Sequence, residues 1–260
     1  MNTTIIRTLQ AALNELGFDA GPEDGIRGRR TRSAETAFWA SQGADDAAGA
    51  SAPVRFKGAA RRLDDIDLPR IGARIGVGED HLHAVMDVEA RGSGFDSQGR
   101  VAMLFEPHIF YRELGPGPAR DRAVAQGLAY RSWRRNYPAD SYPRLMAAME
   151  IDEDAALRSC SWGLGQIMGF NCQMAGYPTA RAMVEHFAED EEHHLNAMVS
   201  YIIAAGLDDE LRRGDWRGFA RGYNGPGYAT HNYHGRLEKA FLKWDAIPDT
   251  PFHPAQEAAA

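Results

Sequence analysis

The amino-acid sequence predicts a mainly α-helical protein: one large α+β domain with a small β-hairpin, preceded by a small three-helix domain. Apolar residues recur at helical spacing through most of the 260 residues, and strands and helices do not alternate regularly, which argues against a doubly wound parallel sheet. Hydrophobic residues make up 44% and charged residues 25% of the chain, which is typical of globular proteins. A chain of this length accommodates one large domain or two unequal ones.

A change of composition divides the chain. The stretch GADDAAGASAP at 43–53 has no large apolar side chain, as expected of a solvated linker. We therefore predict a first domain at 1–43, a linker at 44–61 and a second domain at 62–246. A flexible tail is predicted at 247–260, which is rich in Pro and Ala.

The first domain shows two helical patterns. Ile5, Leu9 and Leu13 recur at helical spacing, and Gly17 follows them as a helix C-cap signal. A second apolar pattern starts at Ala34. The stretch GFDAGPEDGIRG between the two patterns requires tight turns.

The second domain is predicted to be mainly helical, with a strand or hairpin at 97–105, where Gly99 suits a turn. Helices are predicted at Asp64–Ile75, Glu79–Arg91, Tyr142–Arg158, Leu164–Gly169, Thr179–Phe187, Glu191–Ala205, Trp216–Gly222 and Tyr228–Trp244.

Charge and composition disfavour several classes of protein. The net charge of −7 argues against sequence-blind binding of nucleic acid through a basic surface. Cys160 and Cys172 form no CxxC pair, which suits a reducing compartment. The N-terminus lacks the pattern of a signal peptide, and no apolar run approaches ~18 residues. We expect a monomer made in the cytoplasm, without stable membrane insertion.

Glu89 is the first candidate catalytic residue. It follows Leu82 by seven positions and Val85 by four in a predicted helix, which places its carboxyl on the apolar face where the helix gives way to RGSGF. A carboxyl group against apolar neighbours tends to have a raised pKa, which suits a general acid near neutral pH. The alternative is a helix-end glutamate paired with Arg91.

Glu106, in FEPHIFYR, is the second candidate. It follows an apolar stretch and precedes a proline, so a helix N-cap or first-turn role is the structural alternative. Glu89 and Glu106 would flank the short hairpin, and a glycosidase commonly needs two carboxyl groups, one as acid and one as base or nucleophile. Asp87 and Asp96 compete for the second role.

Two glycine-rich motifs are candidates for a binding cleft. SWGLGQIMGFN at 161–171 offers the amide of Gln166, and RGYNGPGY at 221–228 offers Tyr223 and Asn224 before a turn. The structural alternatives are a closely packed helix pair and an ordinary turn.

The remaining residues favour no cofactor. The sequence contains no HExxH motif and no Cys-rich zinc spacing, so we expect neither a metal ion nor a cofactor. Ser161 and Cys160 lack a nucleophile signature such as GxSxG, and phosphate-loop and dinucleotide motifs are absent.

The small domain resembles a peptidoglycan-binding type 1 domain over residues 8–43. The matching residues are Leu9-Gln10, Leu13, Leu16-Gly17-Phe18, Asp24-Gly25-Ile26, Gly28, Thr31, Ala34 and Phe38. The resemblance implies a wall-binding function that involves Asp24, Gly25, Gly28 and Thr31.

The chain from about Leu63 to Trp244 resembles the N-acetylmuramidase domain of modular endolysins from phages of Gram-negative hosts, in the lysozyme-like superfamily. The matching stretches are AVMDVEARGSGF (84–95), GRVAMLFEPHIFYR (99–112), SWGLGQIMGFN (161–171) and YNGPGY (223–228). One departure is Ala90-Arg91, where relatives more often carry Ser-Gly. The resemblance implies a lysozyme-like fold with Glu89 as the catalytic acid. It also places along the glycan cleft Ser161, Gln166, Tyr223 and Asn224.

The expected activity is therefore hydrolysis of the β-1,4 bond between N-acetylmuramic acid and N-acetylglucosamine in peptidoglycan glycan strands. Glu89 would protonate the glycosidic oxygen, and Glu106 would stabilise the oxocarbenium-like state or activate water. The alternatives are a lytic transglycosylase that forms anhydro-muramic products, a zinc amidase or peptidase, and a wall-binding protein without activity.

Overall fold

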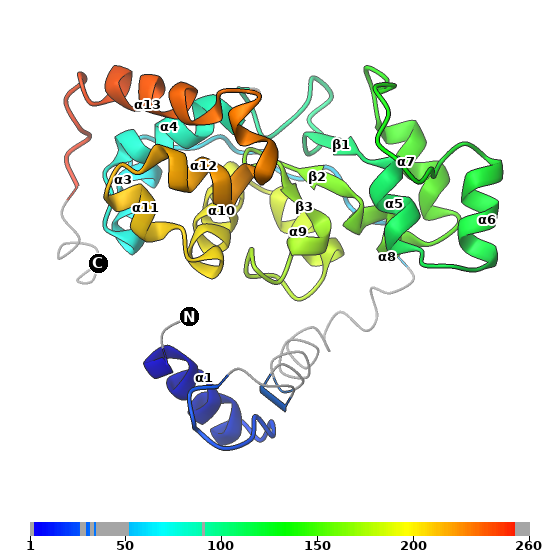
Figure 1. The fold of residues 1–260 in the computed structure, drawn as a ribbon, viewed down its shortest axis with the longest axis horizontal. Coiled ribbons are helices and arrows are strands. Elements are labelled where there is room, and N and C mark those ends of the chain that lie inside the picture. Colours follow the sequence, from blue (N-terminus) through cyan, green and yellow to red (C-terminus); the bar gives the residue numbers. More distant parts are fainter. Residues whose placement is uncertain (1–2, 27–29, 32–33, 35–51, 90–91, 253–260) are drawn as a thin grey trace. The chain divides into compact units, whose positions relative to one another are not determined.

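The computed structural model describes residues 3–26, 30–31, 34, 52–89 and 92–252. The chain divides into two compact units, Met1–Val54 and Arg55–Ala260. The predicted fold class is confirmed, because the described residues are mainly helical and the larger unit contains one small sheet (Figure 1).

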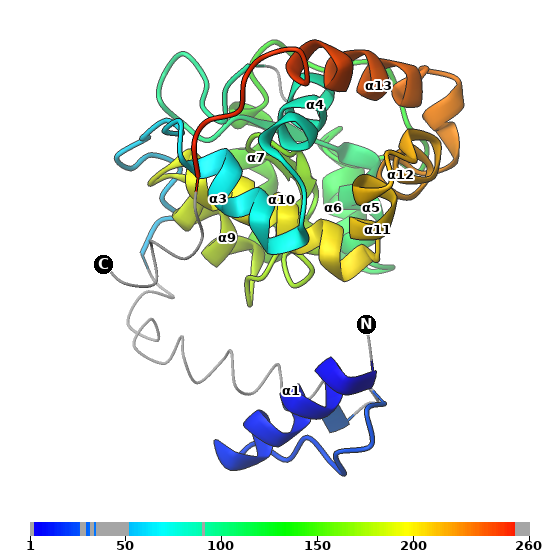
Figure 2. The ribbon, with the colours of Figure 1, turned by 90° about the vertical axis from the view of Figure 1, so that its left-hand side faces the viewer.

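The small unit starts with α1 (Thr3–Glu15), drawn in dark blue in Figure 2. Gly17 follows this helix with a φ of 86°, a left-handed conformation that the predicted C-cap requires. Residues 35–51, which include part of the second predicted helix and of the predicted linker, lie outside the described residues. The core of the described part consists of Leu13, Ala20 and Ala34, with Leu9 and Phe18 packed against them.

A buried glutamine holds the turns of the small unit together. Gln10 Nε2 donates to Asp24 Oδ1 at 3.0 Å and to Thr31 Oγ1 at 3.1 Å. Its Oε1 accepts a hydrogen bond from Gly25 N at 2.9 Å. Three residues of the predicted wall-binding pattern therefore build this loop, and the fourth, Gly28, lies outside the described residues.

The larger unit contains eleven α-helices among its described residues, and none of them is long and apolar enough to cross a membrane. They are α3 (Asp67–Gly72), α4 (Glu79–Glu89), α5 (Pro107–Glu113), α6 (Pro118–Ala125), α7 (Tyr142–Met149), α8 (Glu153–Arg158), α9 (Ala180–Phe187), α10 (Glu191–Ala205), α11 (Asp208–Arg212), α12 (Trp216–Asn224) and α13 (Tyr233–Trp244). Short 3₁₀ turns lie at Ala73–Ile75, Gly169–Asn171 and Pro226–Ala229.

A three-stranded antiparallel sheet lies between two groups of helices. β1 (Met103–Phe105) pairs with β2 (Cys160–Trp162), which pairs with β3 (Ile167–Met168). In Figure 1, α3, α4, α11 and α13 lie to the left of this sheet and α5–α8 lie to its right. Phe105 and Trp162 are fully buried, so the sheet forms part of the core.

The predicted helix at Leu164–Gly169 is wrong, because these residues form the turn and second strand of a β-hairpin. Gly163 has a φ of 66° and Gln166 a φ of 46°, and a right-handed helix excludes both values. The glycines of the stretch SWGLGQIMGFN are compatible with closely packed helices, but they are equally compatible with this tight turn.

Other predicted elements differ in detail; the helix predicted at Tyr228–Trp244, for example, starts at Tyr233. Within the predicted strand at 97–105, β1 covers the last three residues, and Gly99 has a φ of 70° in the preceding turn. The predicted helix Tyr142–Arg158 is interrupted, because Asp152 caps the start of α8 by accepting a hydrogen bond from a backbone N–H of the first turn.

Both ends of the described part of the larger unit pack against it. Phe56 O accepts a hydrogen bond from Val101 N at 3.0 Å, and the Phe56 ring stacks on Trp162 with 6.0 Å between centroids. The last residues of the predicted linker therefore belong to the larger unit, because their aromatic side chain covers part of the core. At the other end, Thr250 N donates to Glu79 Oε1 at 2.7 Å, within the predicted tail.

Candidate active site

Glu89 is the last residue of α4, on the same face as Leu82 and Val85, which are completely buried. Its Oε1 accepts a hydrogen bond of 2.8 Å from Asn224 Nδ2, at the end of α12. Burial raises the pKa of Glu89, although the Asn224 bond and the charge of Arg236 act in the opposite direction. The site thus contains a carboxyl group that keeps its proton to a higher pH than an exposed glutamate does.

Tyr223, one residue before Asn224, connects α12 to the hairpin between β2 and β3. Its hydroxyl donates to Gly165 O at 3.2 Å, and its ring stacks on Phe219 with 5.3 Å between centroids. Burial, together with the nearby Glu89 charge, raises the pKa of Tyr223, so its hydroxyl remains a donor. Tyr223 therefore places the hairpin turn next to the helix end that carries Asn224.

The hairpin turn is closed by its own side chains. Ser161 Oγ donates to Gln166 Oε1 at 2.9 Å, and Gln166 Nε2 donates to Gly163 O at 2.9 Å. The amide that the sequence suggested for a ligand is therefore engaged within the hairpin. Gln166 also borders a cavity of about 290 Å³ that is lined by the loop at 93–104 and by residues 139–142.

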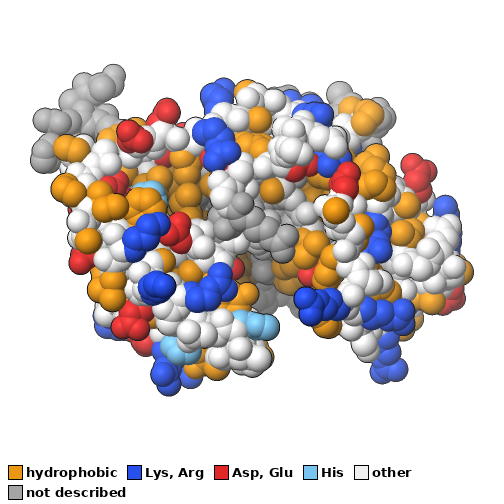
Figure 3. All heavy atoms as spheres, turned by 90° about the horizontal axis from the view of Figure 1, so that it is seen from above, with side chains coloured by type: hydrophobic (Ala, Val, Ile, Leu, Met, Phe, Trp, Pro, Cys, Tyr) orange, Lys and Arg blue, Asp and Glu red, His pale blue; other side chains and the backbone are white. Residues whose placement is uncertain are grey.

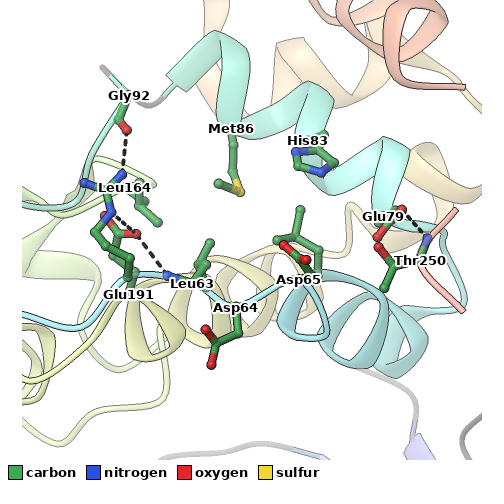
Figure 4. Close-up of a pocket in the computed structure, with 12 residues that line it drawn as sticks. Leu63, Asp64, Asp65, Glu79, His83, Met86, Gly92, Leu164, Glu191 and Thr250 are labelled. Carbon is green, nitrogen blue, oxygen red and sulfur yellow. Dashed lines mark hydrogen bonds and ion pairs between the residues drawn. The ribbon is translucent and has the colours of Figure 1, made fainter. Parts of the chain in front are cut away.

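Two residues of α10 hold the segments around this turn. Glu191 is 2% exposed; its Oε1 accepts from Gly94 N at 2.7 Å and its Oε2 lies 3.0 Å from Arg62 Nε. Figure 4 shows Glu191 at one end of a cavity of about 300 Å³ below α4. His194 Nδ1 accepts from Leu164 N at 3.1 Å. Helix α10 thereby fixes two segments: the one that follows Glu89, and the turn between β2 and β3.

The protonation state of His194 follows from its burial. The side chain is completely buried, which lowers the pKa of His194 to about 4. The ring is neutral near pH 7, and because Nδ1 accepts, Nε2 carries the proton and donates to Phe187 O at 2.8 Å.

Sequence reasoning missed the roles of Glu191 and His194, since their partners lie far away in the chain. One signal in the sequence is the pair of glycines, Gly94 and Gly163, that the His194 imidazole contacts. A Cβ atom on Gly94 would lie 2.3 Å from His194 Nδ1, and one on Gly163 would lie 2.6 Å from it. Both positions therefore need glycine for close packing.

Glu106 directly follows the last residue of β1 and directly precedes the first residue of α5. Glu106 is the N-cap residue of α5, as the structural alternative expected, but its side chain makes no capping hydrogen bond. Instead its Oε2 accepts a hydrogen bond from the Tyr137 hydroxyl and lies 3.3 Å from His108 Nδ1. Burial and the bond to Glu106 raise the pKa of Tyr137, which keeps this hydroxyl a donor.

The two competing aspartates have structural partners. Asp96 bonds to Arg100 Nε at 2.7 Å and, although burial acts in the opposite direction, its bonds within this turn lower its pKa. Asp87 accepts from Lys243 Nζ at 3.1 Å and from Trp244 Nε1 at 3.0 Å. Among the described residues, no group of three His, Cys, Asp or Glu side chains could hold a metal ion.

The surface seen from above is hollowed between its left and right halves, as Figure 3 shows. Glu89 ends α4 and Glu106 directly precedes α5, so the two candidate carboxyl groups are carried by helices from the two groups that flank the sheet.

Comparison with known proteins gives a family. The family model of N-acetylmuramidases matches residues 79–245, which extend from the start of α4 to the end of α13. The crystal structure of a Burkholderia AP3 phage endolysin is similar at 34% sequence identity and a TM-score of 0.65, over 93% of this chain and 96% of that one. No curated protein matches the chain. Since the family model spans more than half of the chain and includes Glu89, Glu106 and the hairpin, the chain belongs to the N-acetylmuramidase family.

Proposed function

We propose that the protein is an endolysin that hydrolyses the β-1,4 bond between N-acetylmuramic acid and N-acetylglucosamine in bacterial peptidoglycan. The observation that carries this proposal is the carboxyl group of Glu89, which burial keeps protonated to a raised pH at the end of α4. The family match indicates the muramidase reaction, and the similar phage endolysin supports the biological role.

Glu89 is the proposed general acid. Because Asn224 Nδ2 donates to Oε1, a proton on Glu89 is directed to Oε2, the oxygen that remains to face a glycosidic bond. Loss of that proton to the leaving oxygen generates a carboxylate, which the same Asn224 bond and the Arg236 charge stabilise.

Glu106 is the proposed second carboxylate. Its side chain is 17% exposed and is oriented by the Tyr137 hydroxyl. In this role it stabilises the positive charge of the oxocarbenium-like state or activates a water molecule.

Asn224 is also the proposed contact to the substrate. Its Oδ1 is buried and has no hydrogen-bond partner among the described residues. A buried acceptor without a partner is costly, and an amide N–H of an N-acetyl sugar would satisfy it once substrate binding has opened access to this oxygen. Ser161, Gln166 and Tyr223 support this site by holding the hairpin turn in place.

The proposed role of the small unit is to bind the wall. The Gln10 network that involves Asp24, Gly25 and Thr31 presents Ile26, which is 67% exposed, on the loop. A tethered wall-binding unit raises the local concentration of substrate at the enzyme. The proposed cycle is synthesis in the cytoplasm as a monomer, followed by access to the wall when a separate lesion opens the membrane.

Product analysis tests the reaction. Purified Gram-negative peptidoglycan is digested, the soluble products are reduced with borohydride, and their masses are measured. Ends with reduced N-acetylmuramic acid support hydrolysis. Anhydro-muramic ends would assign the chain to transglycosylases, and free peptides with uncut glycan would favour an amidase.

Wall binding is tested on the inactive Glu89→Gln protein. The full-length variant should sediment with purified peptidoglycan, and the additional change Ile26→Ser should weaken this binding severalfold without changing the unfolding temperature. Equal binding of the two proteins would count against the proposed surface.

A further inference from the structure

The segment between α6 and α7 concentrates positive charge in an acidic protein. Four arginines and no carboxylate lie between Asp121 and Asp140, although the whole chain has a net charge of −7. Three of them are exposed on the short stretch that follows Tyr130: Arg131, Arg134 and Arg135.

These three guanidinium groups have no carboxylate partner among the described residues. Arg134 lies over the Tyr130 ring, with 4.4 Å between its Cζ and the ring centroid. Many arginines elsewhere in the same unit are paired with carboxylates, as Arg61 is with Asp190 at 2.8 Å. Neighbouring cations without counter-charges repel one another, so their arrangement favours an anionic ligand.

The segment has a defined shape. Tyr130 is buried, its N–H donates to Pro107 O at 3.4 Å, and its hydroxyl donates to Asn136 Oδ1 at 2.6 Å. Arg144 Nη1 donates to Asn136 O at 3.4 Å from the first turn of α7. The arginines are therefore presented on a loop that is held at both ends.

The same segment leads directly to the proposed second carboxylate. Trp133 is 58% exposed, and its ring lies 6.4 Å from the ring of Tyr137, whose hydroxyl donates to Glu106. A ligand that lies on this loop thus approaches the place where the glycan strand is expected to pass.

We propose that Arg131, Arg134 and Arg135 bind the free carboxylates of the stem peptides that peptidoglycan carries along its glycan strand. Guanidinium groups match carboxylates in charge and in planar geometry. This inference rests on the proposed function and adds a preference to it: the enzyme favours strands whose peptides carry free carboxylates.

The test compares two forms of one substrate. Soluble peptidoglycan fragments are used as purified or after their carboxylates have been converted to methylamides. The variant is the triple change Arg131→Gln, Arg134→Gln and Arg135→Gln. The control is the triple change Lys57→Gln, Arg217→Gln and Lys239→Gln, which removes three exposed cations elsewhere on the unit and alters the net charge equally.

For the wild-type protein at low ionic strength, KM should be about tenfold lower on the unmodified fragments, which is within the range of three exposed ion pairs. The triple arginine variant should lose this difference, with kcat unchanged, and the control should retain it. Because exposed charges are screened by salt, the preference of the wild-type protein should also diminish at high ionic strength.

An unchanged preference in the arginine variant, or an equal loss in the control, would overturn the inference. Binding of the wild-type protein but not the arginine variant to phosphatidylglycerol vesicles, with KM values unaffected, would assign the loop to a membrane surface and also overturn it. Failure of the proposed function is distinct, since the wild-type protein would then release no reducing ends from either substrate.

Discussion

Replacing Glu89 by glutamine separates the chemical role of this carboxyl group from its effect on folding. Glutamine has nearly the same shape, and Asn224 Nδ2 can still donate to its amide oxygen. The amide has no proton to transfer to a glycosidic oxygen. General acid catalysis contributes about 10²–10⁴-fold, so we expect kcat to fall by at least about 100-fold.

The same change should stabilise the protein at neutral pH. Burial raises the pKa of Glu89, more than its bond from Asn224 and the charge of Arg236 lower it. An acid with a higher pKa in the folded chain holds its proton more tightly there, so folding loses stability as the pH rises above the ordinary glutamate value of 4.5. Each unit of such a shift corresponds to about 1.4 kcal/mol.

We therefore expect Glu89→Gln to increase both the free energy of unfolding and the Tm at pH 7. The gain should disappear below about pH 4, where the wild-type carboxyl is protonated in both states. Release of soluble fragments from peptidoglycan measures activity, and thermal unfolding at pH 7 and pH 4 measures stability.

Two results would refute this reasoning. Full activity of Glu89→Gln would remove Glu89 from the mechanism. A loss of activity together with a loss of stability at pH 7 would indicate that Glu89 is a structural residue, because a buried catalytic acid weakens the fold that contains it.

Three further predictions concern Asn224, the pair Tyr137 and Glu106, and His194. Asn224→Leu removes the bond to the Glu89 carboxylate, so the alkaline limb of the kcat/KM profile should move to higher pH and the maximal rate should fall about tenfold; an unshifted limb would contradict this role. Tyr137→Phe should lower kcat about tenfold and Glu106→Gln considerably more, and normal turnover by both would remove Glu106 from the mechanism. Burial lowers the pKa of His194 from 6.5 to about 4, so the unfolded chain binds a proton that the folded chain does not, and urea unfolding should show a loss of about 3 kcal/mol as the pH falls through this window. His194→Gln should unfold with a shallower dependence on pH, and an identical slope would refute the assignment.

The sequence was most informative where helices have local signals. The prediction Glu191–Ala205 coincides with α10, because Asp190 caps its start by accepting from His193 N and Gly206 ends it in a left-handed conformation. For α4, the predicted start at Glu79 is also the observed one. Apolar spacing and caps are properties of neighbouring residues, which a single sequence contains.

The sequence was least informative between β1 and α7. Helix α6 was not predicted, and a helix start at Pro107 was considered only as the structural alternative for Glu106, although both α5 and α6 have proline in their first turn, which suits a helix start. Both helices are short, two glycines and a proline lie between them at 114–117, and α6 has almost no separate apolar face, so the period of 3.6 residues is not visible. Packing against the rest of the unit, rather than local pattern, decides their structure.

The candidate acid could be predicted, but its environment could not. The position of Glu89 on an apolar helix face is a local property of α4. The bond from Asn224 connects residues 135 positions apart, and the Glu191 and His194 contacts likewise join distant segments. These contacts set the pKa and orientation of the acid, and they exist only after α10 and α12 have packed against the hairpin.

Gln166 explains why the hairpin needs these contacts. With a φ of 46° it has a left-handed conformation, which costs a non-glycine residue roughly 1–2 kcal/mol, and glycine would avoid this cost. Its amide, however, bonds to Ser161 and to Gly163 O, and two such bonds contribute about 1–3 kcal/mol. The cost of the left-handed conformation is therefore approximately offset, and the hairpin turn is held in a single conformation. Tyr223 donates to this turn from the residue before Asn224, so a rigid hairpin also fixes the amide that orients Glu89.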